Sequence, residues 1–383
     1  MSAPRVLHLI NGEYFGGSAR VLLNYLAASA RQADVAVGVF FRGELERRLE
    51  AMEVPVAQIA MRGRMDLSAA RQVVRLARRH RADIVHTHQV RNTLVGRVAA
   101  RVDGRPVVTH LHSPAFREST SGMRNRLTGG IDRALAGWTR RFIAVSDSLA
   151  REAVRVGIRS ERIRVVPNGV PLPPIADATV REDVRAELGL APDAELVGMV
   201  ANFRPRKGTE VLIEAMALGV GPTTAAHLLL VGEPFREPGR DYGRELAALV
   251  ATRNLSPRTT MTGFRSDPER LMAALDVLVL PSLFGEGLPM VLLEAMGAGV
   301  PVVSTPVEGI VELVRDGETG RLVAPDDPAA LGQAIAWVLE DPVRRRALGA
   351  AARETIIAGY TDERMATGIE AVYAELRAMA DRP

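Results

Sequence analysis

The amino-acid sequence predicts an α/β protein made of two doubly wound domains, each with a parallel sheet covered by helices. Three observations predict this fold: the length of the chain, an alternation of short aliphatic runs with stretches of helical periodicity, and a break after which the alternation restarts. At 383 residues the chain is longer than one hydrophobic core usually organises. A composition of 47% hydrophobic and 25% charged residues is typical of a globular chain.

The first half of the chain carries this alternation. Its short β-branched and aliphatic runs, which we expect to be strands, are residues 5–10, 34–41, 84–87, 106–111, 141–145 and 163–166. The stretches with helical periodicity are residues 19–30, 68–80, 92–102 and 124–138. Because parallel strands are joined by crossover helices, the order of these elements predicts a doubly wound sheet.

The alternation restarts after residues 171–178, which hold three prolines and which we expect to be a linker. The strands expected beyond it are residues 196–201, 226–231, 259–262, 277–281 and 300–305. A final periodic stretch, 362–380, is long enough to return to the first half. We therefore expect one domain from residues 1–172, completed by 362–383, and a second from residues 173–361.

Composition and charge exclude several classes of protein. The absence of cysteine excludes disulfide scaffolds, thiolate metal sites and a cysteine nucleophile. No run reaches the roughly 18 apolar residues that a membrane-spanning helix needs. Residues 1–180 hold 28 basic and 15 acidic residues, which suits anionic lipid headgroups or phosphorylated substrates. Part of this charge is a run of arginines: Arg71, Arg75, Arg78, Arg79 and Arg81.

The densest motif spans residues 281–303, where an expected strand ends and a glycine-rich loop leads into a helix. Gly285 and Gly287 flank Glu286, and we expect Pro289 at the first position of the helix. Free backbone N–H groups and the positive end of the helix dipole favour a phosphate or diphosphate there. Glu286 and Glu294 could hold hydroxyl groups on either side of it.

A second motif lies between an expected strand and a helix that we expect to begin at Gly208. Arg204, Arg206 and Lys207 crowd three cations into this turn, and Lys207 is the only lysine of the chain. Cations oppose the helix dipole at a helix start, so the turn indicates an anionic ligand, although a solvated basic turn is the alternative. A Gly16-Gly17 pair after the first strand would let the backbone approach a ligand closely.

Four of the seven histidines follow or end two neighbouring strands: His86, His88, His110 and His112. The members of each pair stand two residues apart, so we expect them to face the same side of the sheet. A zinc site is one reading of such a group. We expect instead that one or two of the four line a ligand site and that no metal is bound.

These motifs resemble those of the retaining glycosyltransferases of family 4, whose GT-B architecture has two facing Rossmann-like domains with a cleft between them. The family segment reads Glu-Gly-Phe-Gly-Leu-Pro, followed by Glu-Ala-Met-Ala-x-Gly-x-Pro-Val-Val. The matching residues here are Glu286, Leu288, Pro289, Glu294, Ala295, Met296, Gly299 and Pro301. Weaker matches, among them Gly263-Phe264, follow in the family's order over residues 5 to about 325.

The resemblance implies roles for individual residues. Glu286 would lie near the donor sugar, Glu294 would bind the ribose, and Lys207 with an arginine would bind the diphosphate. The family's arginine usually stands five residues before the lysine, where this chain has Asn202, so we assign it to Arg204, with Arg206 as the alternative. His112 is implied to contact the donor sugar near the reacting centre. The implied donor-binding set is completed by Gly16, Gly17, Asn202, Gly263, Phe264, Gly287, Leu288 and Pro289.

The resemblance further implies a retaining transfer of a sugar from a nucleotide-diphosphate sugar, with UDP-sugar the expected donor, to an acceptor hydroxyl. No Asp-x-Asp motif is present, so we expect no metal and no other cofactor. Arg204 and Lys207 would stabilise the leaving diphosphate, and Glu286 would orient the sugar without acting as a nucleophile. A lipid-linked or polysaccharide precursor is the preferred acceptor, and we expect a cytoplasmic protein that can sit peripherally on the inner face of the membrane.

Other functions remain open at the level of the sequence. A soluble small-molecule acceptor, a nucleotide-sugar epimerase of the same architecture and a non-catalytic nucleotide-binding or membrane-surface scaffold all fit the same motifs. A glycosidase fits less well, because a retaining carboxyl pair lies about 5 to 5.5 Å apart. Nucleic acid is not an expected partner, because aromatic residues make up only 4% of the chain and no stacking motif is present.

Overall fold

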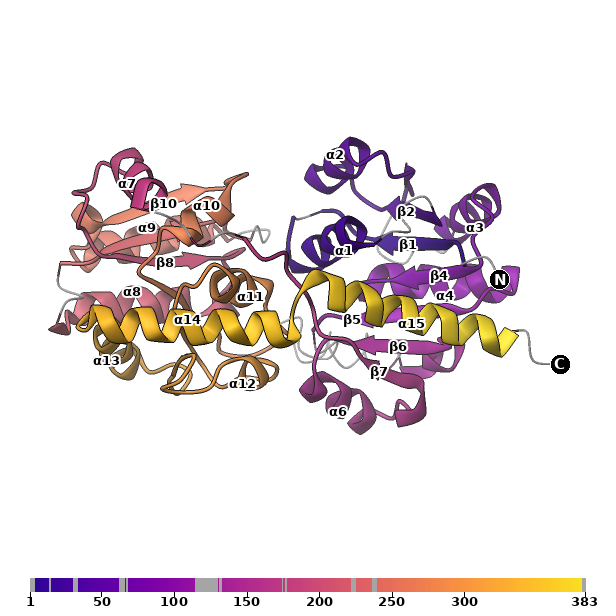
Figure 1. Ribbon diagram of the computed structural model, residues 1–383. Coiled ribbons are helices and arrows are strands. Elements are labelled where there is room, and N and C mark those ends of the chain that lie inside the picture. Colours follow the sequence, from indigo (N-terminus) through magenta and orange to yellow (C-terminus); the bar gives the residue numbers. More distant parts are fainter. Residues whose placement is uncertain are drawn as a thin grey trace. The chain divides into compact units, whose positions relative to one another are not determined.

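The computed structural model describes residues 4–13, 15–29, 34–61, 66, 68–113, 130, 133–173, 175, 178–221, 225–235 and 240–380. The chain divides into two compact units (Figure 1). Unit 1 comprises residues 1–169 and 362–383, and unit 2 comprises residues 170–361. The two ends of unit 2 lie side by side, where the backbone N–H of Val170 donates to the carbonyl of Tyr360 at 3.0 Å.

Within the described residues, unit 1 is built on a seven-stranded sheet in the order β3-β2-β1-β4-β5-β6-β7. All of its strand pairs are parallel, as the alternation of elements predicts. The strands are β1 (Val6–Ile10), β2 (Val35–Val39), β3 (Val56–Gln58), β4 (Ile84–Thr87), β5 (Val107–Leu111), β6 (Arg141–Ala144) and β7 (Ile163–Val165). The order reverses at β1 and β4, the arrangement of a doubly wound sheet.

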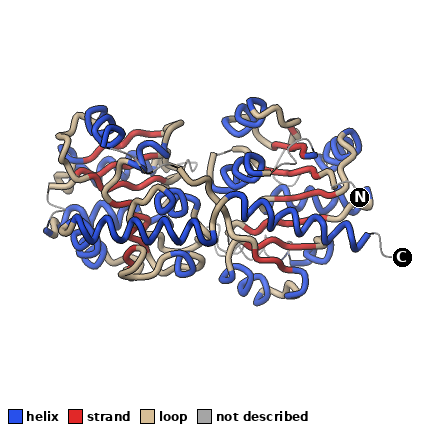
Figure 2. Tube along the Cα trace, viewed as in Figure 1, coloured by secondary structure: helices blue, strands red, loops and turns tan. Residues whose placement is uncertain are grey.

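Helices cover both faces of this sheet (Figure 2). They are α1 (Gly17–Ala28), α2 (Glu44–Ala51), α3 (Ala69–Arg79), α4 (Val90–Asp103), α6 (Asp147–Arg155) and α15 (Asp362–Ala380), with 3-10 turns η2 (Ala136–Trp138) and η3 (Ser160–Arg162). The helices α1 and α15 lie side by side on one face, and α3 and α4 lie side by side on the other. The last helix of the chain therefore completes the first unit, which its length suggested.

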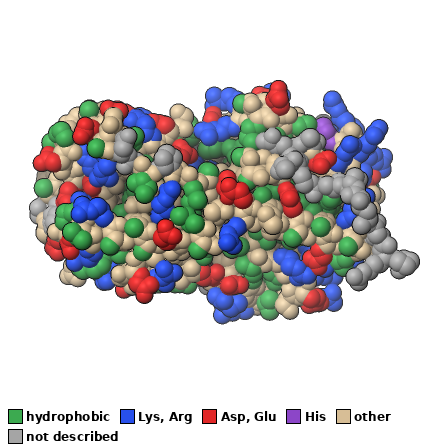
Figure 3. Space-filling view, viewed as in Figure 1, with side chains coloured by type: hydrophobic (Ala, Val, Ile, Leu, Met, Phe, Trp, Pro, Cys, Tyr) green, Lys and Arg blue, Asp and Glu red, His purple; other side chains and the backbone are tan. Residues whose placement is uncertain are grey.

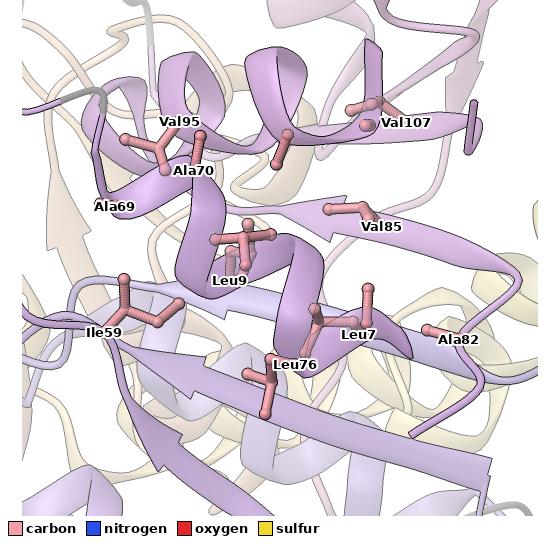
Figure 4. Packing of buried hydrophobic residues seen from close by; sticks show 14 of the residues in the cluster. Leu7, Leu9, Ile59, Ala69, Ala70, Leu76, Ala82, Val85, Val95 and Val107 are labelled. Carbon is pink, nitrogen blue, oxygen red and sulfur yellow. The ribbon is translucent and has the colours of Figure 1, made fainter. Parts of the chain in front are cut away.

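The core between the sheet and the helices α3 and α4 is almost entirely aliphatic, with Phe40 its one buried aromatic side chain among the described residues. Leu7 and Leu9 of β1 point toward Leu76 of α3 and Val95 of α4, and each of these side chains is buried (Figure 4). His8 stands between the two leucines in β1 and is itself fully buried. Because successive strand residues point to opposite faces, His8 faces the helices α1 and α15 instead.

Unit 2 is built on a six-stranded sheet of the described residues in the order β10-β9-β8-β11-β12-β13, again with parallel pairing. The strands are β8 (Leu196–Val200), β9 (His227–Val231), β10 (Thr259–Gly263), β11 (Val277–Leu280), β12 (Val302–Ser304) and β13 (Gly320–Leu322). The helices are α7 (Ala178–Glu187), α8 (Thr209–Leu218), α9 (Tyr242–Thr252), α10 (Pro268–Ala273), α11 (Met290–Gly297), α12 (Ile310–Leu313), α13 (Pro328–Leu339) and α14 (Pro342–Gly359), with 3-10 turns η4 (Pro205–Lys207) and η6 (Ser256–Arg258).

The edge strands β3 and β13 and the helix α2 were not among the expected elements. The edge strand β7, which like β3 and β13 has three residues, was expected at residues 163–166. Most of the helix expected at residues 124–138 lies outside the described residues. No helix in the described part of the chain combines the length and apolar character needed to cross a membrane.

A buried ionic cluster ties the helix α7 to the residue before β11. The carboxylate of Asp276 accepts hydrogen bonds from Arg185 at 2.7 Å and from the backbone N–H of Leu196 at 2.8 Å. Arg181 lies 2.5 Å from the other carboxylate oxygen. The side chains of Arg185 and Asp276 are only 3% and 4% exposed, so water solvates neither charge and the ion pair offsets the cost of burying both.

We expect Asp276→Ala to lower the free energy of unfolding by about 3–5 kcal/mol, because it leaves a buried guanidinium without its counter-ion. Chemical denaturation followed by circular dichroism measures this. The matched control is Glu214→Ala, which removes an ion pair with Arg253 that is partly open to solvent. It should cost at most about 1 kcal/mol. Equal losses in the two variants would contradict a structural role for the buried cluster.

Candidate active site

The basic turn predicted from the sequence is the short helix η4, between β8 and α8. Gly208 follows it with φ +69°, a left-handed conformation that glycine adopts at little cost. A Cβ atom on Gly208 would lie 2.1 Å from the carbonyl oxygen of Pro281. Only glycine lets the backbone of the turn come this close to Pro281. The turn therefore packs directly against the start of the loop at residues 281–289.

The contact between turn and loop is completed by ion pairs to Glu286. Lys207 donates to Glu286 Oε1 at 2.5 Å, and Arg206 lies 3.3 Å from the same oxygen. The hydroxyl of Ser282 donates to it at 2.7 Å. Arg206 also donates to the carbonyl of Gly285 at 3.0 Å. Two motifs that are 79 residues apart in the sequence thus form one charged cluster at the carboxyl ends of β8 and β11.

Burial sets the electrostatics of this cluster. The side chains of Lys207 and Glu286 are 15% and 6% exposed. Burial lowers the pKa of Lys207, and the attraction of Glu286 opposes part of that shift, while Arg206 and Arg204 add to it. Burial alone would raise the pKa of Glu286, but Lys207 and Arg206 outweigh it, so the net pKa of this carboxyl is lowered. The Nζ–Oε1 distance of 2.5 Å is that of a close ion pair.

The loop at residues 281–289 differs from the expectation in two respects. The backbone N–H groups of this loop were expected to point at a bound anion, but those of Gly285 and Glu286 both donate to one carboxylate oxygen of Glu308, at 2.9 and 3.2 Å. Pro289 is the residue before the helix α11 rather than its first residue, because its ψ of 121° is extended. The N–H groups of Gly285 and Glu286 thus converge on a carboxylate oxygen, as expected for an anion site, but this oxygen belongs to the side chain of Glu308.

Other expected donor-binding residues lie around the same edge of the unit 2 sheet. Asn202 and Arg204 follow β8, and the guanidinium of Arg204 stacks on the ring of Phe235 at 3.8 Å. Gly263 ends β10, next to Phe264, whose side chain is 46% exposed. Glu294 lies within α11. Gly287 and Leu288 are buried in the loop between Glu286 and Pro289.

Gly16 and Gly17 and the four histidines belong to unit 1. Gly16 caps the start of α1, and its carbonyl accepts the first helical hydrogen bond from Arg20 at 3.1 Å. The histidine pairs face one side of the sheet, as their spacing predicts, and a fifth residue that the sequence did not single out, His8, joins them. The five rings form a nearly continuous stack, with centroids 4.2 Å apart between His110 and His112 and 4.7 Å apart between His8 and His86.

The histidine stack is uncharged. Burial lowers the pKa of His8 and of His112 to about 3 in each case. Burial, reinforced by the neighbouring imidazoles, holds the pKa of each of the other three well below its usual value. Among the described residues, two groups of three histidines bring ring nitrogens within 4.8 Å of one another. One group is His8, His86 and His88, and the other is His88, His110 and His112.

Comparison with known proteins identifies the class to which this fold and site belong. Residues 15–172 match the family model described as Glycosyltransferase Family 4, and residues 180–355 match the model described as Glycosyl transferases group 1. Together the two matches span most of the chain. The protein is a glycosyltransferase of family 4 type, with the two Rossmann-like parallel-sheet domains of the GT-B fold.

Individual relatives show what proteins of this kind do. The chain is 26% identical over 318 residues to an Escherichia coli UDP-Gal:alpha-D-GlcNAc-diphosphoundecaprenol alpha-1,3-galactosyltransferase, covering 81% of this chain and 80% of that protein. It is 31% identical over 280 residues to a D-inositol 3-phosphate glycosyltransferase of Nocardia farcinica, covering 70% and 61%. The crystal structure of Anabaena HepE in complex with UDP and glucose has a TM-score of 0.88 at 25% identity, over 97% of this chain and 100% of that chain.

Sequence reasoning missed four contributors that this geometry brings in. Ser282 lies within the motif at residues 281–303 but was given no role, and Glu308 lies in a turn that no pattern marked. His8 was hidden because a lone histidine in an aliphatic strand has no spacing to interpret. Tyr373 contacts the histidine stack from a helix almost 300 residues later, which only the fold can show.

We expect Gly208→Ala to destabilise the protein through two separate effects. The positive φ costs about 1–2 kcal/mol for any side chain, and the contact with Pro281 adds about 1–3 kcal/mol. Gly317→Ala is the matched control, since Gly317 has φ +77° and no atom within 4 Å of its added Cβ. Thermal unfolding of both variants separates the effects. Equal destabilisation would mean that the turn does not depend on its contact with the loop.

Because the stacked histidines are neutral in the folded protein, we expect the free energy of unfolding to fall as the pH is lowered. Unfolded histidines bind a proton near pH 6.5, whereas folded His8 and His112 bind one only near pH 3. Between these values the unfolded state holds more protons, so stability falls as the pH falls, by up to about 1.4 kcal/mol per pH unit for each residue. Urea unfolding at pH 7, 6 and 5 measures this slope. His110→Leu should reduce it by about one proton, and an unchanged slope would contradict protonation of the stack on unfolding.

Proposed function

We propose that this glycosyltransferase moves a sugar from a nucleotide-diphosphate sugar, with UDP-sugar as the donor, to an acceptor hydroxyl with retention of anomeric configuration. The observation that carries the proposal is the buried cluster of Lys207, Arg206 and Glu286 at the carboxyl ends of two adjacent parallel strands, where open α/β sheets bind their ligands. The relatives that act on or bind UDP-linked sugars support the donor class.

The barrier in such a transfer is the breaking of the anomeric C–O bond, during which negative charge gathers on the leaving diphosphate. Lys207 and Arg204 are the cations that we assign to this charge. Arg206, already bound to Glu286 and to the carbonyl of Gly285, is better placed to hold the loop. Fixed cations in a buried site stabilise developing charge without rearranging when it appears, so the proposal needs no divalent ion.

Glu308 supports an anion site in the loop. Its carboxylate accepts from the backbone N–H groups of Gly285 and Glu286, in the loop that the sequence analysis assigned to the donor, which indicates that this position accepts a negatively charged oxygen. We assign the same two donors to the diphosphate when substrate binds. Glu308 then has to release them, and it does so in exchange for an oxygen of similar charge.

The remaining roles follow the resemblance. We propose that His112 contacts the transferred sugar, that Glu294 binds the ribose, and that the acceptor attacks from the face that the diphosphate leaves. An oxygen of the diphosphate takes the proton of the acceptor hydroxyl. Glu286, held by Lys207 and Ser282, orients the sugar; its carboxylate is too firmly engaged to be a nucleophile.

We propose a lipid-linked acceptor, reached from the membrane surface. The run of five arginines is exposed, and Lys and Arg side chains gather over α3 in Figure 3. Such a surface favours anionic headgroups. The galactosyltransferase from Escherichia coli acts on a diphosphoundecaprenol-linked sugar, whereas the Nocardia farcinica relative acts on inositol 3-phosphate. Radiolabelled transfer assays with a polyprenyl-diphosphate sugar and with soluble phosphorylated acceptors distinguish the two, and epimerised donor without transfer would contradict both.

We expect Lys207→Ala to lower kcat at least about 100-fold while the fold is retained, because it removes the compact cation from the leaving diphosphate. Turnover of a UDP-sugar is followed by release of UDP. Arg240→Ala is the matched control, since it removes an exposed cation of the same unit that pairs with Glu245. Unchanged turnover in the lysine variant would overturn the assigned role of Lys207.

A further inference from the structure

The pairing of β8 with β9 continues beyond the ends of both strands. The backbone N–H of Phe203 donates to the carbonyl of Glu233 at 2.9 Å, and the backbone N–H of Phe235 donates to the carbonyl of Phe203 at 2.8 Å. Phe203 and Pro234 form an isolated parallel bridge at this point. The backbone of Phe235 is therefore held beside Phe203, the residue before Arg204.

The residues around Phe203 alternate between the core and the surface. The side chain of Phe203 is 1% exposed, whereas Asn202 and Arg204 are partly exposed. The backbone of Arg204 is extended, with φ −138° and ψ 151°. Because neighbouring residues of an extended chain point to opposite sides, Asn202 and Arg204 share one side. Arg204 thus stands on the same side as the position at which the family motif has its arginine.

The guanidinium of Arg204 lies over the ring of Phe235, with its Cζ atom 3.8 Å from the ring centroid. No other contact of this kind among the described residues is shorter than 4.2 Å. The face of an aromatic ring attracts a cation through its quadrupole. A guanidinium that stacks on a ring keeps its N–H donors at its edge. Phe235 therefore restricts the orientation of the guanidinium without occupying its donors.

Arg206 is held in a different way. It lies 3.3 Å from Glu286 Oε1 and donates to the carbonyl of Gly285 at 3.0 Å. A carboxylate offsets the charge of a guanidinium and takes up its donors, whereas an aromatic ring does neither. Phe235 is thus a partner that fixes Arg204 without competing with an anion, whereas Glu286 does compete for Arg206.

Arg204 and Lys207 belong to one cluster of positive charge. The backbone N–H of Lys207 donates to the carbonyl of Arg204 at 2.8 Å, which closes the turn. Burial is the main cause of the lowered pKa of Lys207, and the charge of Arg204 contributes to it. An anion bound between like charges relieves their repulsion. The two cations can therefore contact one anion from neighbouring positions of the turn.

We propose that Phe235 is a positioning residue that holds the guanidinium of Arg204 toward the diphosphate of the bound donor. This inference rests on the role assigned to Arg204 in the proposed function. Phe235 is given no contact with the reacting atoms. It acts through Arg204, by limiting the conformations that this long side chain samples before substrate binds. An arginine oriented in advance loses less conformational entropy when it engages the anion.

The direct test is a double-mutant cycle measured as kcat/KM for a UDP-sugar, followed by release of UDP. Phe235→Leu keeps an apolar side chain but removes the aromatic face, and it should lower kcat/KM about fivefold. Arg204→Ala alone should lower it about 100-fold. In Arg204→Ala protein, adding Phe235→Leu should cause no further loss, because the residue through which Phe235 acts is gone. Losses that multiply in the double variant would overturn the inference.

Three controls distinguish positioning from a general loss of structure. Phe235→Trp keeps an aromatic face and should leave kcat/KM within about twofold of wild type. In Arg206→Ala protein, Phe235→Leu should still cost about fivefold, since its effect does not pass through Arg206. Trp337→Leu removes a ring of α13 from beneath the guanidinium of Arg344, at 4.2 Å, and should leave kcat/KM unchanged. An effect of Phe235→Leu that vanishes in Arg206→Ala protein would assign the ring to the other arginine.

Binding supplies a second readout that does not depend on transfer. A competing account is that the ring of Phe235 stacks on the nucleobase itself. Calorimetry of UDP and of uridine separates the two accounts, since only UDP carries the diphosphate. Phe235→Leu should weaken UDP about fivefold and leave uridine unchanged. Equal weakening of both ligands would contradict positioning and would place the ring at the base.

The outcomes also separate this inference from the proposed function. If Phe235→Leu weakens UDP only in protein that retains Arg204, but wild-type protein transfers no sugar from any UDP-sugar, the positioning role stands and the proposed function fails. If transfer is normal and Phe235→Leu changes neither kcat/KM nor the affinity for UDP, the function stands and the positioning role fails.

Discussion

The ion pair between Lys207 and Glu286 is the interaction on which the site in unit 2 depends. It is buried, it joins a turn and a loop from different parts of the sequence, and Gly208 makes the joint possible by removing a side chain from the contact with Pro281. A buried pair of this kind contributes little net stability, since desolvation offsets much of the attraction. Its value is positional: the pair fixes the lysine at the edge of the sheet where the strands end.

The two units differ in the charge of their buried polar side chains. In unit 2, cations and carboxylates are buried together, and a bound diphosphate would exchange with carboxylates of the chain, Glu308 among them. In unit 1, burial removes charge altogether, and the stacked imidazoles are joined by hydrogen bonds from Tyr373 to His112. The first arrangement suits a leaving group that gains negative charge, and the second suits contact with a neutral hydroxyl.

Most of the sheet architecture could be predicted, because both sheets are parallel and their central strands are continuous aliphatic runs. The final helix, Asp362–Ala380, was predicted with its observed bounds, since its periodicity is long and uninterrupted. The edge strands β3 and β13, of three residues each, were missed, although β7, of the same length, was predicted. Within the site, glycine spacing and the single lysine marked Lys207 and Glu286, but nothing local showed that they pair. Glu308 and Tyr373 reach their partners only through the fold, so their roles were beyond any local motif.

The most direct test of the account compares calorimetric binding of UDP and of uridine to the wild-type protein in the presence of EDTA. If protein cations and backbone donors hold the diphosphate, UDP should bind roughly a hundredfold more tightly than uridine without any divalent ion, the effect expected from two charge-assisted hydrogen bonds. Equal affinity for the two ligands, or a preference for UDP that appears only when Mg²⁺ or Mn²⁺ is added, would contradict it.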